Sequence, residues 1–197
     1  MKILLINNHT DFIDKLENFL GTINSANVNI VDLVDVNRID ANSYDLVVLS
    51  GGHDIPKALF GENIQAERAL IKNIQVPLIG ICYGFELIAQ VYGSKLGKLA
   101  TKEKGVIKIY SIKDDPIFAE KKEFNVFEAH QWFINALGKD LIPLAKSIDG
   151  IEIFKHNVKL IYGFQFHPEV FEQENDGYVL LEKAIEELTK KKHSQTV

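Results

Sequence analysis

The chain holds one cysteine, Cys82, and it lies in the segment Gly80-Ile81-Cys82-Tyr83-Gly84. A nucleophile between two glycines, where an apolar strand runs into a helix, is the nucleophile-elbow pattern, here with Cys in place of Ser. The glycines permit a sharp turn, which would place the sulfur at a helix N-terminus, where the dipole favours thiolate. We therefore predict that Cys82 is a nucleophile. The alternative is a buried, inert cysteine, because free cysteines are among the most buried residues.

A histidine and a carboxylate follow the last predicted strand, in His167-Pro168-Glu169. The imidazole could take the thiol proton and return it to a leaving amine, while Glu169 could orient the imidazole. Residues i and i+2 of an extended segment point to opposite sides, so Pro168 must bend the chain. Taken singly, the two residues could be a surface histidine and a solvated carboxylate. A metal site would need further ligands, none is spaced to help, and we predict neither a metal nor a cofactor.

The elements that must position these residues alternate along the first half of the chain. Strands are predicted over residues 2–6, 28–34, 44–49 and 76–81, and helices over 12–20, 62–74 and the stretch after Cys82. Such alternation favours an α/β fold with a mainly parallel sheet. Ligands bind at the carboxyl ends of the strands in such sheets, and both Gly51-Gly52 and Cys82 fall at such ends.

The second half indicates antiparallel or mixed strands added to the parallel core. Strands are predicted over residues 105–112, 123–128, 148–156 and 159–166, the last two as a pair. A final helix is predicted over 176–188, with Tyr178, Leu181, Ile185 and Leu188 as apolar positions, and the tail from Lys190 is expected to fray. Because there is no linker, repeat or low-complexity block, residues 1–197 are predicted to form a single domain.

Composition excludes several classes of protein. The hydrophobic share of 46% and the charged share of 25% are ordinary for a soluble globular protein of 197 residues. A net charge of −5 gives no sign of nucleic-acid binding, and no apolar run is long enough to cross a membrane. One cysteine excludes an intrachain disulfide, and the N-terminal apolar run breaks too early for a signal peptide. We expect a cytoplasmic protein without nucleic-acid or membrane partners.

Three segments together resemble the class I glutamine amidotransferases. They are Ser50-Gly51-Gly52, the elbow at Cys82, and Gly163-Phe164-Gln165-Phe166-His167-Pro168-Glu169-Val170. The resemblance covers nearly the whole chain. It implies a flavodoxin-like three-layer fold and a triad of Cys82, His167 and Glu169. It also implies hydrolysis of the glutamine side-chain amide, through a thioester, to glutamate and ammonia.

The oxyanion formed in such a reaction needs preorganised backbone donors. The N–H of Tyr83, next to the nucleophile, is one candidate, and the N–H of Gly52 is the other by similarity to the family. Gly51 of the same loop is assigned to substrate binding, although the glycine pair could be only a tight turn. The segment 50–54 also resembles the pyrophosphate loop of ATP pyrophosphatases. In that loop a Ser stands where this chain has Ile55, and the loop would not explain Cys82 and His167.

Phe85 and Glu86 depart from the family pattern, which has His-Gln after the elbow. The Gln helps to recognise glutamine in the family. Glu86 keeps an acceptor, loses the amide donors and adds a charge, and it could pair with the ammonium of the substrate. The sequence Gly84-Phe85-Glu86 resembles γ-glutamyl hydrolases, so cleavage of γ-glutamyl peptides is the second candidate activity. Otherwise Phe85 is a core residue and Glu86 a carboxylate favoured by the helix dipole.

Residues 87–97 are similar to the glutaminase subunits of two-chain GMP synthases. His130, in Phe127-Glu128-Ala129-His130-Gln131, stands where that group has a Ser-His segment, which makes it a candidate substrate-binding residue or one that only shapes the surface. The next residues, Gln131-Trp132-Phe133, differ from the usual Met-Asp-Glu. The chain has no G-x-x-x-x-G-K-[ST] loop, so ATP is expected to bind a separate synthetase subunit that receives the ammonia. A non-catalytic regulatory module is the third candidate, against which the three triad residues argue.

Overall fold

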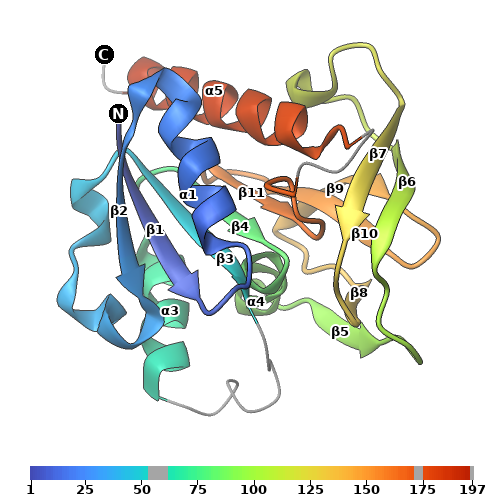
Figure 1. The fold of residues 1–197 in the computed structure, drawn as a ribbon, viewed down its shortest axis with the longest axis horizontal. Coiled ribbons are helices and arrows are strands. Elements are labelled where there is room, and N and C mark those ends of the chain that lie inside the picture. Colours follow the sequence, from blue (N-terminus) through green and yellow to red (C-terminus); the bar gives the residue numbers. More distant parts are fainter. Residues whose placement is uncertain (53–61, 171–174, 196–197) are drawn as a thin grey trace.

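The computed structural model describes residues 1–52, 62–170 and 175–195. In these ranges nine strands form one sheet in the order β2-β1-β3-β4-β11-β10-β9-β6-β7 (Figure 1). Its first half is parallel and consists of β1 (Lys2–Asn8), β2 (Asn27–Asp32), β3 (Leu46–Gly52), β4 (Leu78–Ile81) and β11 (Ile161–Phe164). Except for the edge strand β2, which is NVNIVD and has no buried position, these strands are nearly continuous apolar runs, as expected where helices cover both faces.

The other half of the sheet is antiparallel. It consists of β10 (Ile151–His156), β9 (Leu141–Lys146), β6 (Gly105–Ser111) and β7 (Glu123–Glu128). A separate two-stranded ribbon pairs β5 (Lys95–Lys98) with β8 (Trp132–Ala136). The predicted α/β class, with antiparallel strands added in the second half, is confirmed.

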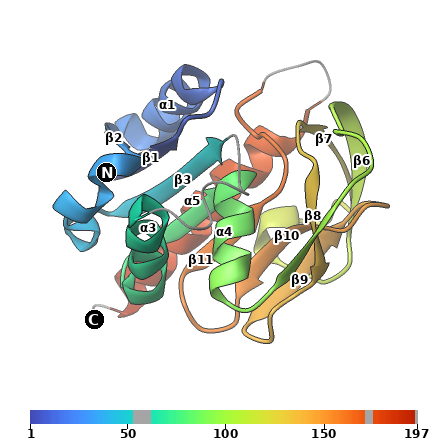
Figure 2. The same cartoon turned by 90° about the horizontal axis from the view of Figure 1, so that it is seen from below.

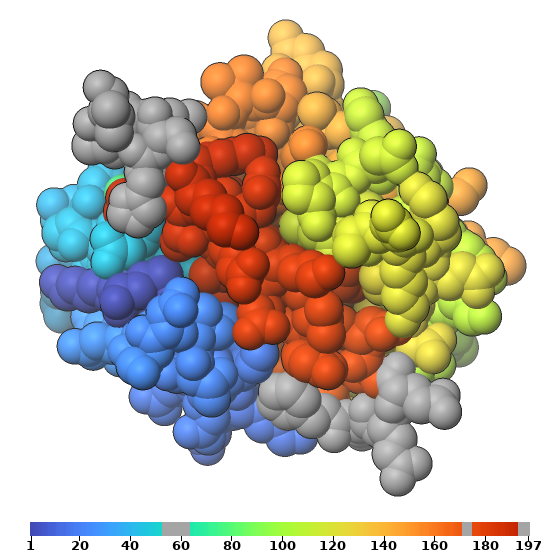
Figure 3. Space-filling model, turned by 90° about the horizontal axis from the view of Figure 1, so that it is seen from above, coloured from blue at the N-terminus to red at the C-terminus, as the bar shows by residue number. Residues whose placement is uncertain are grey.

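Helices cover both faces of the sheet and give the three layers that the resemblance implied. The helices α1 (Ile13–Thr22) and α5 (Gly177–Gln195) lie on one face, and α3 (Glu62–Asn73) and α4 (Tyr83–Val91) lie on the other (Figures 1 and 2). Alternate strand residues belong to different cores, since Ile3 and Leu5 pack with α1 and α5, whereas Leu4 and Ile6 pack with α3 and α4. Figure 3 shows α5 in the middle of its face.

Short 3₁₀ helices complete the connections, at Ile23–Ser25, Leu33–Arg38, Ala41–Ser43 and Pro116–Phe118. One of them shortens a predicted strand. The strand expected over 28–34 ends at Asp32, because the Asp32 carboxylate accepts a hydrogen bond from the N–H of Val34 and caps the 3₁₀ helix that follows.

The final helix is longer than predicted. It continues to Gln195 instead of fraying from Lys190, and Lys191 pairs with Glu187 at 2.6 Å while Lys192 pairs with Asp45 at 3.1 Å. Tyr178 was predicted to be an apolar position but is 41% exposed, beside the buried face of the helix that includes Gly177, Leu180 and Leu181. Among the described helices, none combines the length and the apolar character that a membrane crossing requires. The single domain stays a prediction, although one sheet does run through both halves of the sequence.

Candidate active site

Cys82 lies between β4 and α4 in a strained backbone conformation, with φ 49° and ψ −104°. Non-glycine residues seldom adopt a positive φ, and such strain is concentrated at functional sites. The flanking glycines are needed for a reason other than the one predicted, since neither has a positive φ. A Cβ on Gly80 would lie 2.6 Å from the carbonyl carbon of Gly84, and one on Gly84 would lie 2.5 Å from the carbonyl oxygen of Leu49. The glycines therefore let segments approach closely, while the cysteine itself takes the sharp turn.

The imidazole of His167 and the carboxylate of Glu169 are in contact, with 2.9 Å between Nδ1 and Oε1. Both side chains are buried. The chain turns at Pro168, and the N–H of Val170 donates to the carbonyl of His167 at 3.2 Å. The bend at Pro168 that this pair requires is present, and the carboxylate fixes the orientation of the imidazole.

Cys82 and His167 both lie next to Gly51, at the carboxyl ends of β3 and β4. A Cβ on Gly51 would lie 2.8 Å from Cε1 of His167 and 3.6 Å from Cβ of Cys82. The same position is 3.4 Å from Oγ1 of Thr10, a residue that no motif in the sequence singled out. The structure thus brings Gly51, Cys82, His167 and Glu169 together from three distant parts of the chain.

The thiol of Cys82 is more basic than the elbow pattern suggested. Burial raises its pKa well above the ordinary value, and the nearby carboxylates Glu86, Glu128 and Glu169 raise it further. Against these, the backbone N–H of Tyr83 bonds the sulfur and lowers the pKa. The expected preference for thiolate at the helix N-terminus is therefore wrong for the resting protein, because dehydration of the sulfur outweighs the helix dipole. A base must take the proton when the sulfur reacts.

The N–H of Tyr83 belongs to the first turn of α4, where backbone donors have no partner within the helix. Gly52 ends β3 beside Asn8, whose carbonyl oxygen leaves no room for a Cβ on Gly52. Their roles as oxyanion donors stay predictions. His53, Asp54 and Ile55, on which the comparison with ATP pyrophosphatases depends, lie outside the described residues.

Buried polar side chains hold the glycine loop. Ser50 Oγ accepts from the N–H of Asn8 at 2.9 Å and donates to the carbonyl of Gly51 at 2.8 Å. The amide of Asn8 donates to Glu67 of α3 at 3.0 Å. Burial raises the pKa of Glu67 to about 7. The network thus connects the glycine loop to the sheet through Asn8 and to the helix α3 through Glu67.

Glu86 is buried in the first turn of α4 and accepts a hydrogen bond from Nε2 of Gln165 at 3.0 Å. Burial raises its pKa to about 8, although the Gln165 bond and the charge of His130 act in the opposite direction. The extra charge expected from the sequence is thus largely absent at neutral pH, and the protonated carboxyl offers one donor and one acceptor, as an amide does. Phe85 is a core residue, stacked on Phe154 with 4.7 Å between ring centroids.

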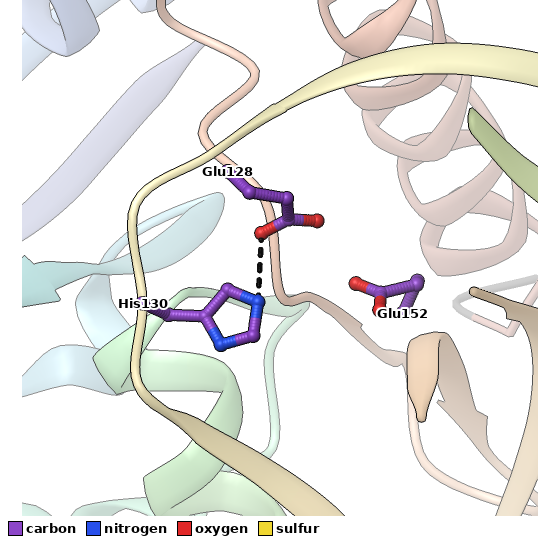
Figure 4. Close-up of side chains that lie close together, drawn as sticks. All are labelled: Glu128, His130 and Glu152. Atoms are coloured by element: carbon purple, nitrogen blue, oxygen red, sulfur yellow. Dashed lines mark ion pairs between the residues drawn. The ribbon is translucent and has the colours of Figure 1, made fainter. Parts of the chain in front are cut away.

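His130 is not a surface residue, since it is only 4% exposed. Its Nδ1 lies 2.7 Å from the carbonyl of Trp132, and its Nε2 faces Glu128 at 3.2 Å (Figure 4). The alternative of a role in shaping the surface is therefore wrong, while its predicted role in substrate binding stays a prediction. Glu128 and Glu152 were missed as members of this buried group. The available signal was a lone charge within an apolar strand, as in Ile151-Glu152-Ile153.

The chain is similar to known proteins along most of its length. The sequence profile described as Glutamine amidotransferase class-I matches residues 4–187. A glutamine-hydrolyzing GMP synthase subunit of Methanococcus vannielii is 33% identical over 181 residues, which cover 90% of this chain and 93% of the relative. The corresponding subunit of Methanocaldococcus jannaschii is 30% identical with the same coverage.

Among solved structures, a protein from Thermoplasma acidophilum that is described as a putative GMP synthase subunit superposes with a TM-score of 0.87. It is 26% identical and covers 100% of this chain and 98% of its own. The resemblance that three short segments indicated thus extends along the whole chain. The chain belongs to the class-I glutamine amidotransferases.

Proposed function

We propose that this chain is the glutaminase subunit of a two-chain GMP synthase, releasing ammonia from glutamine for a separate ATP-dependent synthetase subunit. The observation that carries the proposal is the position of Cys82 and of the His167–Glu169 pair next to Gly51. The choice of GMP synthase among the amidotransferases rests on the relatives, which are named as glutamine-hydrolyzing subunits of that enzyme.

In the first half of the reaction, His167 takes the proton of the Cys82 thiol as the sulfur attacks the side-chain amide carbon of glutamine. The tetrahedral intermediate carries its negative charge on oxygen, toward the N–H groups of Tyr83 and Gly52. When it collapses, the carbon–nitrogen bond breaks, His167 protonates the departing nitrogen, and ammonia leaves a thioester on Cys82.

In the second half, His167 takes a proton from water, and the resulting hydroxide adds to the thioester carbon. The carbon–sulfur bond then breaks, His167 returns the proton to the sulfur, and glutamate leaves. Glu169 holds Nδ1 of the imidazole throughout and stabilises its protonated form. Because the thiol is protonated at rest, this base has to act in every turnover.

The direct test measures ammonia and glutamate released from glutamine by the purified chain. The assay is repeated after adding the synthetase subunit of a two-chain GMP synthase with ATP and its nucleotide substrate. We expect slow hydrolysis by the chain alone and a higher turnover with the partner. Equal rates with and without the partner would contradict the coupling, and absence of hydrolysis in both would contradict the glutaminase activity.

Cleavage of γ-glutamyl peptides is the second candidate, favoured by the Gly84-Phe85-Glu86 sequence. The same assay with γ-glutamyl dipeptides in place of glutamine separates the two activities. Ammonia from glutamine with intact dipeptides supports the amidotransferase, whereas cleaved dipeptides with intact glutamine support the hydrolase. If neither substrate is consumed, the chain is a non-catalytic module.

Glu86 offers a pH-dependent test of substrate recognition. We expect Glu86→Gln to keep a kcat/KM close to that of the wild type at pH 7, since the wild-type carboxyl is then largely protonated. About one tenth of the carboxyl stays protonated one unit above its pKa, so at pH 9 the variant should exceed the wild type by about tenfold. The measurement is kcat/KM for glutamine from pH 6 to 9.5 in chelator-treated buffer.

The other groups around Glu86, which are Cys82, Glu128 and His130, are the same in both proteins, so their contributions are expected to cancel in the ratio of the two rates. Stability supplies an independent check. The carboxyl of Glu86 ionises near pH 4.5 in the unfolded chain and near pH 8 in the folded protein. As the pH rises from 4.5 to 8, the free energy of unfolding of the wild type should therefore fall relative to that of Glu86→Gln. Parallel pH profiles would show that the ionisation of Glu86 does not affect recognition.

A further inference from the structure

One imidazole and two carboxylates converge in the antiparallel half of the molecule. Glu128 ends β7, His130 follows it, and Glu152 comes from β10 (Figure 4). All three side chains are buried, and one ligand atom from each lies within 4.8 Å of those from the others. The three residues, called here the E128 cluster, do not include any member of the proposed triad.

The orientation of His130 is set by its surroundings. Nδ1 lies 2.7 Å from the carbonyl oxygen of Trp132, which can only accept, so Nδ1 carries a proton. In the neutral ring Nε2 then presents a lone pair, and it faces Oε2 of Glu128 at 3.2 Å and Oε2 of Glu103 at 3.5 Å. A lone pair that faces carboxylate oxygens in a dry interior is repelled unless a positive charge lies between them. A backbone carbonyl on the other ring nitrogen is also the arrangement typical of a metal-binding histidine.

Nδ1 of His130 bonds the carbonyl of Trp132 and Oε1 of Glu152 accepts from Ser147 Oγ at 2.6 Å, but the remaining polar atoms of the E128 cluster face only one another and Glu103. Both carboxylate oxygens of Glu128, one of Glu152 and Nε2 of His130 are buried, and they have no hydrogen-bond partner outside the E128 cluster and Glu103. The exposed fraction of the side chain is 2% for His130 and 0% for Glu128. Buried polar atoms without partners are rare in folded proteins, because each costs about 1–3 kcal/mol. A single bound cation would satisfy these atoms together.

We propose that Glu128, His130 and Glu152 bind one divalent transition-metal ion, of which Zn²⁺ best suits an imidazole with carboxylates. Glu103, whose Oε2 lies 3.5 Å from Nε2 of His130 but outside this group of three, could supply a fourth ligand after a shift of its side chain. Four protein ligands make a closed, structural site. The ion would join β7 and β10, whose neighbouring carbonyls, at Phe127 and Glu152, accept from the N–H groups of His167 and Gln165.

The proposal departs from the sequence-based expectation of no metal and gives His130 a role other than contact with the substrate. Its rival is a cluster held by protons alone. Burial raises the pKa of Glu128 to about 8, and Glu152 has a pKa well above its usual value, so protons could replace the cation. Metal titration distinguishes the two.

The experiment is a calorimetric titration of the chelator-stripped Cys82→Ser protein with Zn²⁺ at pH 7.5. The serine removes the thiol that could otherwise hold Zn²⁺ together with His167. We expect one ion per chain with a Kd of about 1 µM or tighter, and a rise in Tm on binding. Mg²⁺ at the same concentration should give neither effect, because it prefers all-oxygen octahedral sites.

Ligand variants and a matched control complete the design, all in the Cys82→Ser background. Glu152→Gln and His130→Gln should each weaken Zn²⁺ binding at least tenfold and remove the rise in Tm. Glu67→Gln, which changes another buried carboxyl of raised pKa outside the E128 cluster, should bind Zn²⁺ as the parent does. Circular dichroism checks that each variant is folded.

Absence of stoichiometric Zn²⁺ binding by the folded parent would overturn the proposal and leave protons as the charge that holds the cluster. Binding that survives both ligand substitutions would also overturn it, since the ion would then lie elsewhere. The titration of the parent protein tests the proposal by itself, so the proposal can be rejected even if a variant fails to fold. None of these readouts depends on glutaminase activity.

Discussion

Replacing Cys82 with serine is expected to lower kcat for glutamine hydrolysis at least about 10⁴-fold, because the reaction then loses its nucleophile. A hydroxyl is a far weaker nucleophile than a thiolate, and the buried site around residue 82 does not help it to ionise. Ammonia release at saturating glutamine, with the synthetase partner present, measures the loss. Binding of glutamine should change much less, since the serine preserves the shape of the site.

His167→Gln supplies the control for this prediction. Residues that act as one unit are not additive, so the double variant of Cys82→Ser and His167→Gln should be about as slow as the slower single variant. If the Cys82→Ser protein kept full activity, both the amidotransferase and the γ-glutamyl hydrolase proposals would fail. Multiplicative losses in the double variant would instead mean that the two residues act in separate steps.

Gly51→Ala is expected to lower kcat about 10²-fold while the protein stays folded, because small errors in the placement of reacting groups are costly. The new methyl group would lie 2.8 Å from Cε1 of His167, closer than van der Waals contact allows. The imidazole must then shift away from its observed position next to Gly51. Steady-state kinetics with glutamine should show the effect mainly in kcat, and the Tm should fall only slightly.

The matched control is Gly21→Ala, near the end of α1. A Cβ there meets no atom within 4 Å, so activity should remain at the wild-type level. An unchanged kcat for Gly51→Ala would show that the imidazole does not need its observed position. A pure rise in KM would assign Gly51 to substrate binding alone, as the sequence suggested.

The parallel half of the sheet could be predicted from the sequence because four of its five strands, β1, β3, β4 and β11, are largely buried and appear as apolar runs. Three later strands, β5, β8 and β9, could not be predicted from the sequence. The strand β9 contains Pro143, which normally argues against a strand. It is tolerated because β9 pairs with β6 only at Ala145 and Lys146, and the stretch around Pro143 has no pairing to β6.

The candidate site also contains residues that could be predicted from the sequence and residues that could not. Cys82, His167 and Glu169 stand in short local patterns whose spacing indicates their chemistry. The E128 cluster has no such pattern, since Glu128 and Glu152 lie on β7 and β10, which are not neighbours in the sheet, and the two residues come together only in the folded chain. The raised pKa of Cys82 could not be predicted from the sequence either, because it depends on burial and on carboxylates that the fold brings close to the sulfur.

The backbone N–H groups of Cys82 and His167 donate hydrogen bonds to different strands of the sheet. The N–H of Cys82 donates to the carbonyl of Phe164 in β11, whereas the N–H of His167 donates to the carbonyl of Phe127 in β7. These two strands lie in the middle and at the edge of the sheet. A displacement of β7 relative to β11 would therefore change the separation between the imidazole of His167 and the sulfur of Cys82.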